Sequence, residues 1–168
     1  MSEADGKKMS RSLATSLALG AYVVPYALSR STSPSPDHPR ILLWYKLLRQ
    51  PFFKPPDIAI PVTWVALETG LALAAYRLLR KPASHRRTVS LSLLAGNVAA
   101  VGGWSRLFFG SRNLPLSTVA AAAMVVTGAA YAVEARPLDK PAAAAGIALT
   151  GWVAFAAVLT AAIWHKNR

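Results

Sequence analysis

The stretch WYKLLRQPFFKPPDIAIPVTW, residues 44–64, decides how the rest of the chain is interpreted. It begins and ends on tryptophan, and it holds four prolines and three basic residues in between. Long apolar segments lie on both sides of it. Proline interrupts helices, and charged side chains are costly inside a bilayer. The position of this stretch beside apolar segments of membrane type therefore requires a structural or functional explanation.

Composition favours a membrane protein. Of the 168 residues, 54% are hydrophobic and 15% are charged, whereas soluble domains average about 25% charged residues. The net charge is +12, but the basic residues stand mainly between apolar segments, where they suit lipid headgroups better than nucleic acid. The chain has no cysteine, and its three histidines are far apart. We therefore expect no nucleic-acid partner, no disulfide framework and no metal cluster.

Five segments approach the length and apolarity of a membrane-spanning helix, which needs roughly 20 residues. They are residues 12–28, 59–79, 89–109, 116–133 and 142–164. We predict an all-α integral membrane protein with a polar tail over residues 1–11 and a single five-helix domain over residues 12–168. The first segment follows a basic lead-in and has a signal peptide as its alternative, although its length and Pro25 favour a retained helix.

The positive-inside rule leaves the orientation open, because ten basic residues fall on one side of the five segments and nine on the other. The dense basic loop before residue 88 favours a cytoplasmic amino terminus. We expect a multi-pass protein of a bacterial cell membrane, with the outer membrane as an alternative. Ala95, Ala99 and Gly103 form a small-residue stripe, which suits either a helix contact within the domain or the seam of a homodimer.

The five tryptophans fall into two groups. Trp164 stands at a segment end and suits the interfacial aromatic belt, and Trp44 stands near a boundary too. Trp64, Trp104 and Trp152 lie on three different apolar segments, and an indole N–H removed from water usually has a partner. Three such rings predict either ordinary core packing or the walls of one cavity for a flat apolar ligand.

Three motifs resemble signature segments of the TspO/MBR family of tryptophan-rich sensory proteins and translocator proteins. They are the stretch quoted above with the three residues that follow it, WSRLFFG at residues 104–110 and WVAFAAVL at residues 152–159. The resemblance implies a five-transmembrane-helix bundle, often dimeric, with a cavity that binds protoporphyrin IX, other tetrapyrroles or further apolar ligands. It also implies that a loop over residues 30–58 forms a lid on this central cavity. The prolines of residues 44–64 then restrict an irregular backbone that covers the cavity mouth.

By the same resemblance, the ligand-binding residues divide between the lid and the cavity walls. The expected set is Trp44 and Tyr45 on the lid and Trp64, Glu68, Asn97, Trp104, Phe108, Trp152 and Ala156 on the walls. Several positions depart from the family pattern. Glu68 replaces a usual aromatic residue, and Ala161 replaces the tyrosine of a sterol-associated pattern, which argues against sterol binding through it.

Glu68 stands near the centre of its apolar segment, and an acid at that depth suggests a functional site. It has two interpretations: a hydrogen-bonded structural acid, or an acid facing the cavity, with Arg106 as a candidate partner. No histidine or methionine is expected on the cavity wall, so no metal site or cofactor is predicted, and metal-free porphyrin is favoured over haem. Acidic side chains of a porphyrin would lie near Lys46, Arg49 or Lys54 at the mouth.

Three functions remain open. The first is a protein that binds porphyrin-type ligands for sensing, regulation or transport. The second is an enzyme that degrades protoporphyrin oxidatively in light, with Trp64 and Trp152 as the candidate catalytic electron donors. The third is a small proton-coupled exporter in which Glu68 alternates between a proton and a cation, although its proline-rich stretch is unusual for that class.

Overall fold

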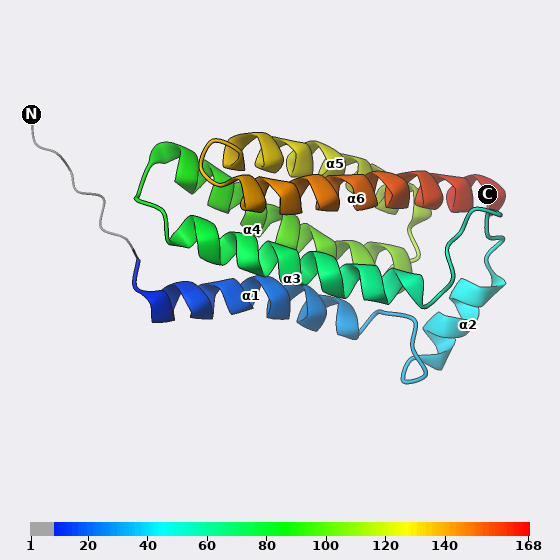
Figure 1. Ribbon diagram of the computed structural model, residues 1–168. Coiled ribbons are helices and arrows are strands. Elements are labelled where there is room, and N and C mark those ends of the chain that lie inside the picture. The colour runs from blue at the N-terminus through cyan, green and yellow to red at the C-terminus, as the bar shows by residue number, and fades with distance from the viewer. Residues whose placement is uncertain (1–8) are drawn as a thin grey trace, which may run out of the picture.

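The computed structural model describes residues 9–168, and within that range every regular element is a helix. Five helices are long and lie side by side, and a short one lies near the end where the chain finishes (Figure 1). In chain order the elements are α1 (Arg11–Arg30), α2 (Pro39–Leu47), α3 (Ala59–Leu79), α4 (His85–Ser105), the π-helix η1 (Arg106–Gly110), α5 (Leu114–Ala135) and α6 (Lys140–Lys166).

Side-chain caps explain where the helices start. Ser10, Ser84, Asn113 and Asp139 each precede a long helix and accept a hydrogen bond from a backbone N–H of its first turn. Such caps satisfy amides that lack a partner within the helix. For this reason α4 begins at His85, four residues before the predicted boundary, although its first turn is polar.

Four of these helices, α1, α3, α5 and α6, are long and apolar enough to cross a membrane. The prediction of all-helical membrane structure is confirmed in this form. The helix α4 falls short because it carries polar side chains such as Arg87, Ser90 and Asn97. All three are buried against the rest of the protein. Hydropathy averages a helix over all its sides, so it does not separate polar groups that face protein from those that face lipid.

The segment between α1 and α3 differs from the predicted irregular loop, because nine of its residues form the helix α2. Pro39 stands at the start of this helix, where proline is tolerated since the first N–H groups have no helical partner. Beyond Leu48 the prolines at positions 51, 55 and 56 prevent a continuous helix up to α3. The connection is therefore part helix and part irregular chain.

Small residues let the helices approach closely. A Cβ added to Gly102 on α4 would lie 2.6 Å from the Cβ of Leu28 on α1. A Cβ added to Gly146 on α6 would lie 2.6 Å from the ring of Tyr131 on α5. Both distances are shorter than any carbon–carbon contact allows, so these positions require glycine at the present spacing. These two contacts set the spacing between α4 and α1 and between α6 and α5.

The stripe of Ala95, Ala99 and Gly103 faces away from the other helices of the chain. Ala95 and Ala99 are exposed, and a Cβ added to Gly103 would meet nothing within 4 Å. The first interpretation of this stripe, a helix contact within the domain, is therefore wrong for the described residues. Its small side chains instead leave part of the α4 surface open.

Candidate functional site

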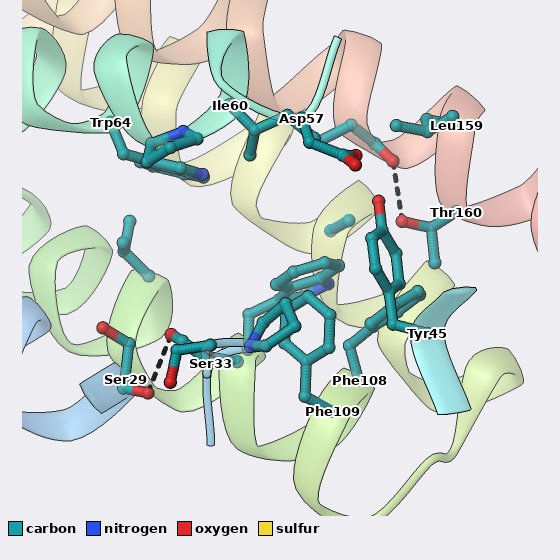
Figure 2. A pocket seen from close by; sticks show the side chains of 18 of the residues that line it. Ser29, Ser33, Tyr45, Asp57, Ile60, Trp64, Phe108, Phe109, Leu159 and Thr160 are labelled. Atoms are coloured by element: carbon teal, nitrogen blue, oxygen red, sulfur yellow. Dashed lines mark hydrogen bonds between the residues drawn. The ribbon is translucent and has the colours of Figure 1, made fainter. Parts of the chain in front are cut away.

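A cavity of about 600 Å³ lies at the end of the molecule that carries α2. Side chains from the end of α1, the connection to α3, α3 itself, α4 with η1, α5 and α6 line it (Figure 2). Trp64 and Ile60 enter from α3, Phe108 and Phe109 from η1, and Tyr45 from α2. Volumes of about 300–1,000 Å³ suit drug-sized ligands and cofactors.

Trp64 and Trp152 both line the cavity and meet on one side of it. Their ring centroids are 6.4 Å apart and the rings are nearly perpendicular. Phe155 extends this wall at 5.5 Å from Trp152. The indole Nε1 of Trp152 is buried and has no hydrogen-bond partner among residues 9–168. A ligand with an acceptor atom would satisfy that donor.

Trp104 and Phe108 form the opposite aromatic surface. Their rings stack with centroids 5.0 Å apart. The π-helix η1 inserts an extra residue into the end of α4, and such bulges re-aim side chains at functional sites. Both Phe108 and Phe109 thereby line the cavity. The indole N–H of Trp104 donates to the carbonyl of Ser117 at 2.9 Å, so only its ring is available to a ligand.

The two predicted lid residues have different positions. Tyr45 lines the cavity and contacts the rings of Phe108 and Phe109 edge-on at 6.4 and 5.5 Å. Its burial, together with the nearby charge of Asp57, raises the pKa of Tyr45 to about 12. Trp44 does not line the cavity. It packs against Phe108 at 5.8 Å, and Arg112 lies over its ring at 5.3 Å, so Trp44 supports the aromatic surface from behind.

The irregular part of the connection is held to the end of α6. The side-chain oxygen of Asn167 accepts from the Arg49 N–H at 2.9 Å, and the Asn167 amide donates to the Arg49 carbonyl at 3.2 Å. Near the other end of the connection, the hydroxyls of Thr32 and Ser105 lie 3.1 Å apart. These contacts join the connection to the ends of α4 and α6.

Glu68 faces the cavity from α3 and is only 8% exposed. Within residues 9–168 it makes no hydrogen bond or ion pair. Arg106, its predicted partner, is exposed and does not line the cavity. The cavity-facing interpretation therefore describes Glu68 better than a structural acid hydrogen-bonded to a neighbouring helix.

Asn97 lies outside the cavity, contrary to the prediction. It is one helical turn before Val101, which does line the cavity. At that depth α5 closes the space: the Asn97 side-chain oxygen accepts from Thr127 at 3.0 Å, and its amide donates to the Leu93 carbonyl at 2.8 Å. Asn97 is thus a buried contact between α4 and α5.

The expectation that no histidine or methionine lines the cavity is also wrong. Met124, from α5, lies on its wall, and His38 lies at its mouth, 3.1 Å from the Ser35 hydroxyl. Met124 was missed because the surrounding sequence is almost uniformly small and apolar, so periodicity does not show which side faces inward.

Of the three predicted basic residues at the mouth, Lys46 lines the cavity and Lys54 is paired with Asp57. Arg49 does not line the cavity, and Arg30, which was not predicted, does. The α6 wall continues the helical spacing of Trp152 and Ala156 through Thr160, a signal that the sequence already contained.

Known proteins share this sequence pattern. Proteins named translocator protein from Ovis aries and Sus scrofa are each 31% identical to the chain, over 130 and 132 residues. These alignments cover 74% and 76% of this chain and 75% and 76% of the relatives. The translocator protein of Homo sapiens is 28% identical over 134 residues, 77% of this chain and 78% of the relative. The pattern of the TspO/MBR family matches residues 13–165, so the chain belongs to the TspO/MBR family.

Proposed function

We propose that this protein binds porphyrin-type tetrapyrroles and related flat apolar ligands in the cavity, and that it acts in sensing, regulation or transport. The observation that carries the proposal is the set of tryptophan rings around one space. Trp64 and Trp152 stand on one side and Trp104 on another, and the volume is about 600 Å³. Flat aromatic walls favour a flat ligand, because stacked and edge-on contacts use the whole ring.

The distribution of charge supports a ligand with acidic groups at one end. Arg30 and Lys46 line the mouth together with Asp37 and with Asp57, which is paired with Lys54. Val101, Met124 and Val153 line apolar parts of the wall. A porphyrin carries an apolar ring and two carboxylates on one edge. It would bury the ring against the walls and leave its carboxylates beside these basic side chains.

The test is an absorbance titration of the purified protein with protoporphyrin IX in darkness. We expect a saturable shift of the porphyrin band. Trp64→Phe and Trp152→Phe should each weaken binding by about 2- to 12-fold, since aromatic pair contacts are worth about 0.5–1.5 kcal/mol. Trp164→Phe is the matched control, because Trp164 does not line the cavity. Weaker binding in the control together with normal binding in both cavity variants would contradict the proposal.

We propose further that α4 is a fifth membrane span and that residues 30–58 form the lid. The helix α4 has 21 residues, as α3 does, and packs between α1 and α5. Its polar side chains Ser90 and Asn97 are buried and so are shielded from lipid. Because the chain has no cysteine, single cysteines can be placed at His85 and Arg112. Labelling from opposite sides of sealed vesicles would support the span, and labelling from one side would contradict it.

A homodimer is the third part of the proposal. The exposed residues Ala95 and Ala99 would allow two copies of α4 to approach closely. We expect Ala99→Cys to form a disulfide-linked dimer under mild oxidation, while a cysteine at the exposed Val126 of α5 does not. Equal crosslinking at both positions would indicate random collision in the membrane.

Light-dependent oxidative degradation of protoporphyrin is a second candidate function. It is favoured by the contact between Trp64 and Trp152 on the cavity wall, since indole is the most easily oxidised of these side chains. Illumination of the bound complex in air should then bleach the porphyrin band, and Trp152→Phe should slow the bleaching more than it weakens binding in darkness. A band that is stable in light leaves binding as the function.

A further inference from the structure

Glu68 is an acid on the cavity wall that forms no ion pair with any group of residues 9–168. The ion pairs of residues 9–168 involve the acids Asp57, Glu134 and Asp139, and none involves Glu68. Its carboxyl also accepts no hydrogen bond from the described part of the chain. Since the residue is 8% exposed and lines the cavity, the space beside its carboxyl is the cavity itself.

An isolated carboxylate in such a position is costly. Moving an ionised carboxyl out of water costs several kcal/mol after relaxation, and a close opposite charge with hydrogen bonds offsets this cost. Acids within membrane segments therefore usually pair with another group or face a pathway for ions or substrates. The described part of the chain places no such group beside Glu68, so a ligand in the cavity is a candidate source of the opposite charge.

The surroundings of Glu68 also suit a cation. Trp64 is one turn earlier on the same side of α3, and Trp152 contacts its ring at 6.4 Å. Cations are attracted to the faces of tryptophan rings, more strongly when water is excluded. The pairing of one carboxyl with adjacent aromatic rings is a favourable site for an organic ammonium or amidinium group.

The rest of the molecule restricts what kind of cation reaches this site. The chain carries a net charge of +12, and the basic residues Arg30 and Lys46 line the cavity together with the acids Asp37 and Asp57, the latter paired with Lys54. A small hydrated cation would gain little from the apolar walls. A flat aromatic body with one cationic nitrogen would gain the burial of its ring as well as the pairing with Glu68.

We propose that the cavity prefers flat aromatic ligands that carry a cationic nitrogen, with Glu68 as the residue that determines this preference. The inference rests on the proposed function in using the same cavity, and it narrows the class of ligand. The edge of a porphyrin ring offers Glu68 no cation, so an aromatic amine or amidine is the better complement to this part of the wall.

The test compares two dyes of nearly the same shape with the full-length protein in a neutral detergent. 9-Aminoacridine is cationic at neutral pH, and acridine is uncharged there. Fluorescence titrations should show that the wild-type protein binds 9-aminoacridine at least about 30-fold more tightly than acridine, the effect of a close buried charge pair. Glu68→Gln keeps the size of the side chain and removes its charge, and it should bring the two affinities within about threefold.

Glu134→Gln is the matched control, because Glu134 lies at the end of α5 and does not line the cavity. It should keep the wild-type preference. Equal binding of the two dyes by the wild-type protein would overturn the inference, and so would a preference that survives in Glu68→Gln. Protoporphyrin IX is titrated in parallel: if it binds while the dyes are not distinguished, the inference fails and the proposed function stands. If it does not bind while the Glu68-dependent preference is present, tetrapyrrole binding fails and the inference stands.

Discussion

The contact between Asn167 and Arg49 offers a direct test of the proposed lid. Replacing Asn167 by alanine removes both hydrogen bonds that join the connection to the end of α6, at 2.9 and 3.2 Å. It also removes a bond within α6, from the Asn167 amide to the Ile163 carbonyl at 2.7 Å, which does not involve the lid.

The expected change in the ligand dissociation rate follows from the loss of the two hydrogen bonds between Arg49 and Asn167. A typical hydrogen bond contributes about 0.5–1.5 kcal/mol to stability, and these two are exposed, which places each near the lower end. Their joint loss of about 1–2 kcal/mol would raise the population of an open lid by about 5- to 30-fold. If the ligand leaves through the open lid, its dissociation rate should rise by the same factor.

Stopped-flow fluorescence of protoporphyrin IX release measures this rate. Hydrogen exchange at the Arg49 amide provides an independent measurement, because that N–H loses its acceptor, the side-chain oxygen of Asn167. Lys166→Ala is the control, since Lys166 is an exposed residue of the same helix end. An unchanged release rate in Asn167→Ala, combined with faster exchange at Arg49, would show that the ligand does not leave past this segment.

Three further predictions follow from the packing and the charges. Gly102→Ala should destabilise the protein by about 1–3 kcal/mol in a thermal melt, because the new Cβ would lie 2.6 Å from the Cβ of Leu28. Phe108→Ala should cost about 3–5 kcal/mol of unfolding free energy, since its ring is 2% exposed, and it should abolish porphyrin binding in the same titration. Burial acts to raise the pKa of Asp139, but hydrogen bonds from Arg77, the Ala142 amide and Lys81 outweigh it and hold the pKa at about 2, below the ordinary 3.8. The ionised Asp139 therefore stabilises the folded state above pH 3.8, and this contribution of about 1–2 kcal/mol is lost as the pH falls toward 2. Asp139→Asn keeps a helix cap, and it should remove this part of the acid dependence from denaturation curves.

The sequence by itself determined the helical membrane class, the approximate extents of the long helices and the family. These properties depend on local patterns: runs of apolar residues, capping residues such as Ser84 and Asp139, and short motifs around Trp64, Trp104 and Trp152. Each of these properties can be recognised from residues that are close together in the sequence. The family resemblance also predicts Tyr45 and Phe108 as ligand-binding residues, and both line the cavity.

Only the tertiary structure decided which of the candidate residues share one space. Asn97 is turned against α5, Trp44 lies behind Phe108, and Met124 lines a wall that no sequence feature marked. It also decided that Glu68 has no hydrogen-bond or ion-pair partner among residues 9–168, and that Arg106, on η1, does not line the cavity. The physical reason is that an apolar helix has no polar side to fix its rotation. In these uniformly apolar helices, close contacts such as that of Gly102 with Leu28 set the rotation, and those contacts join residues far apart in the chain.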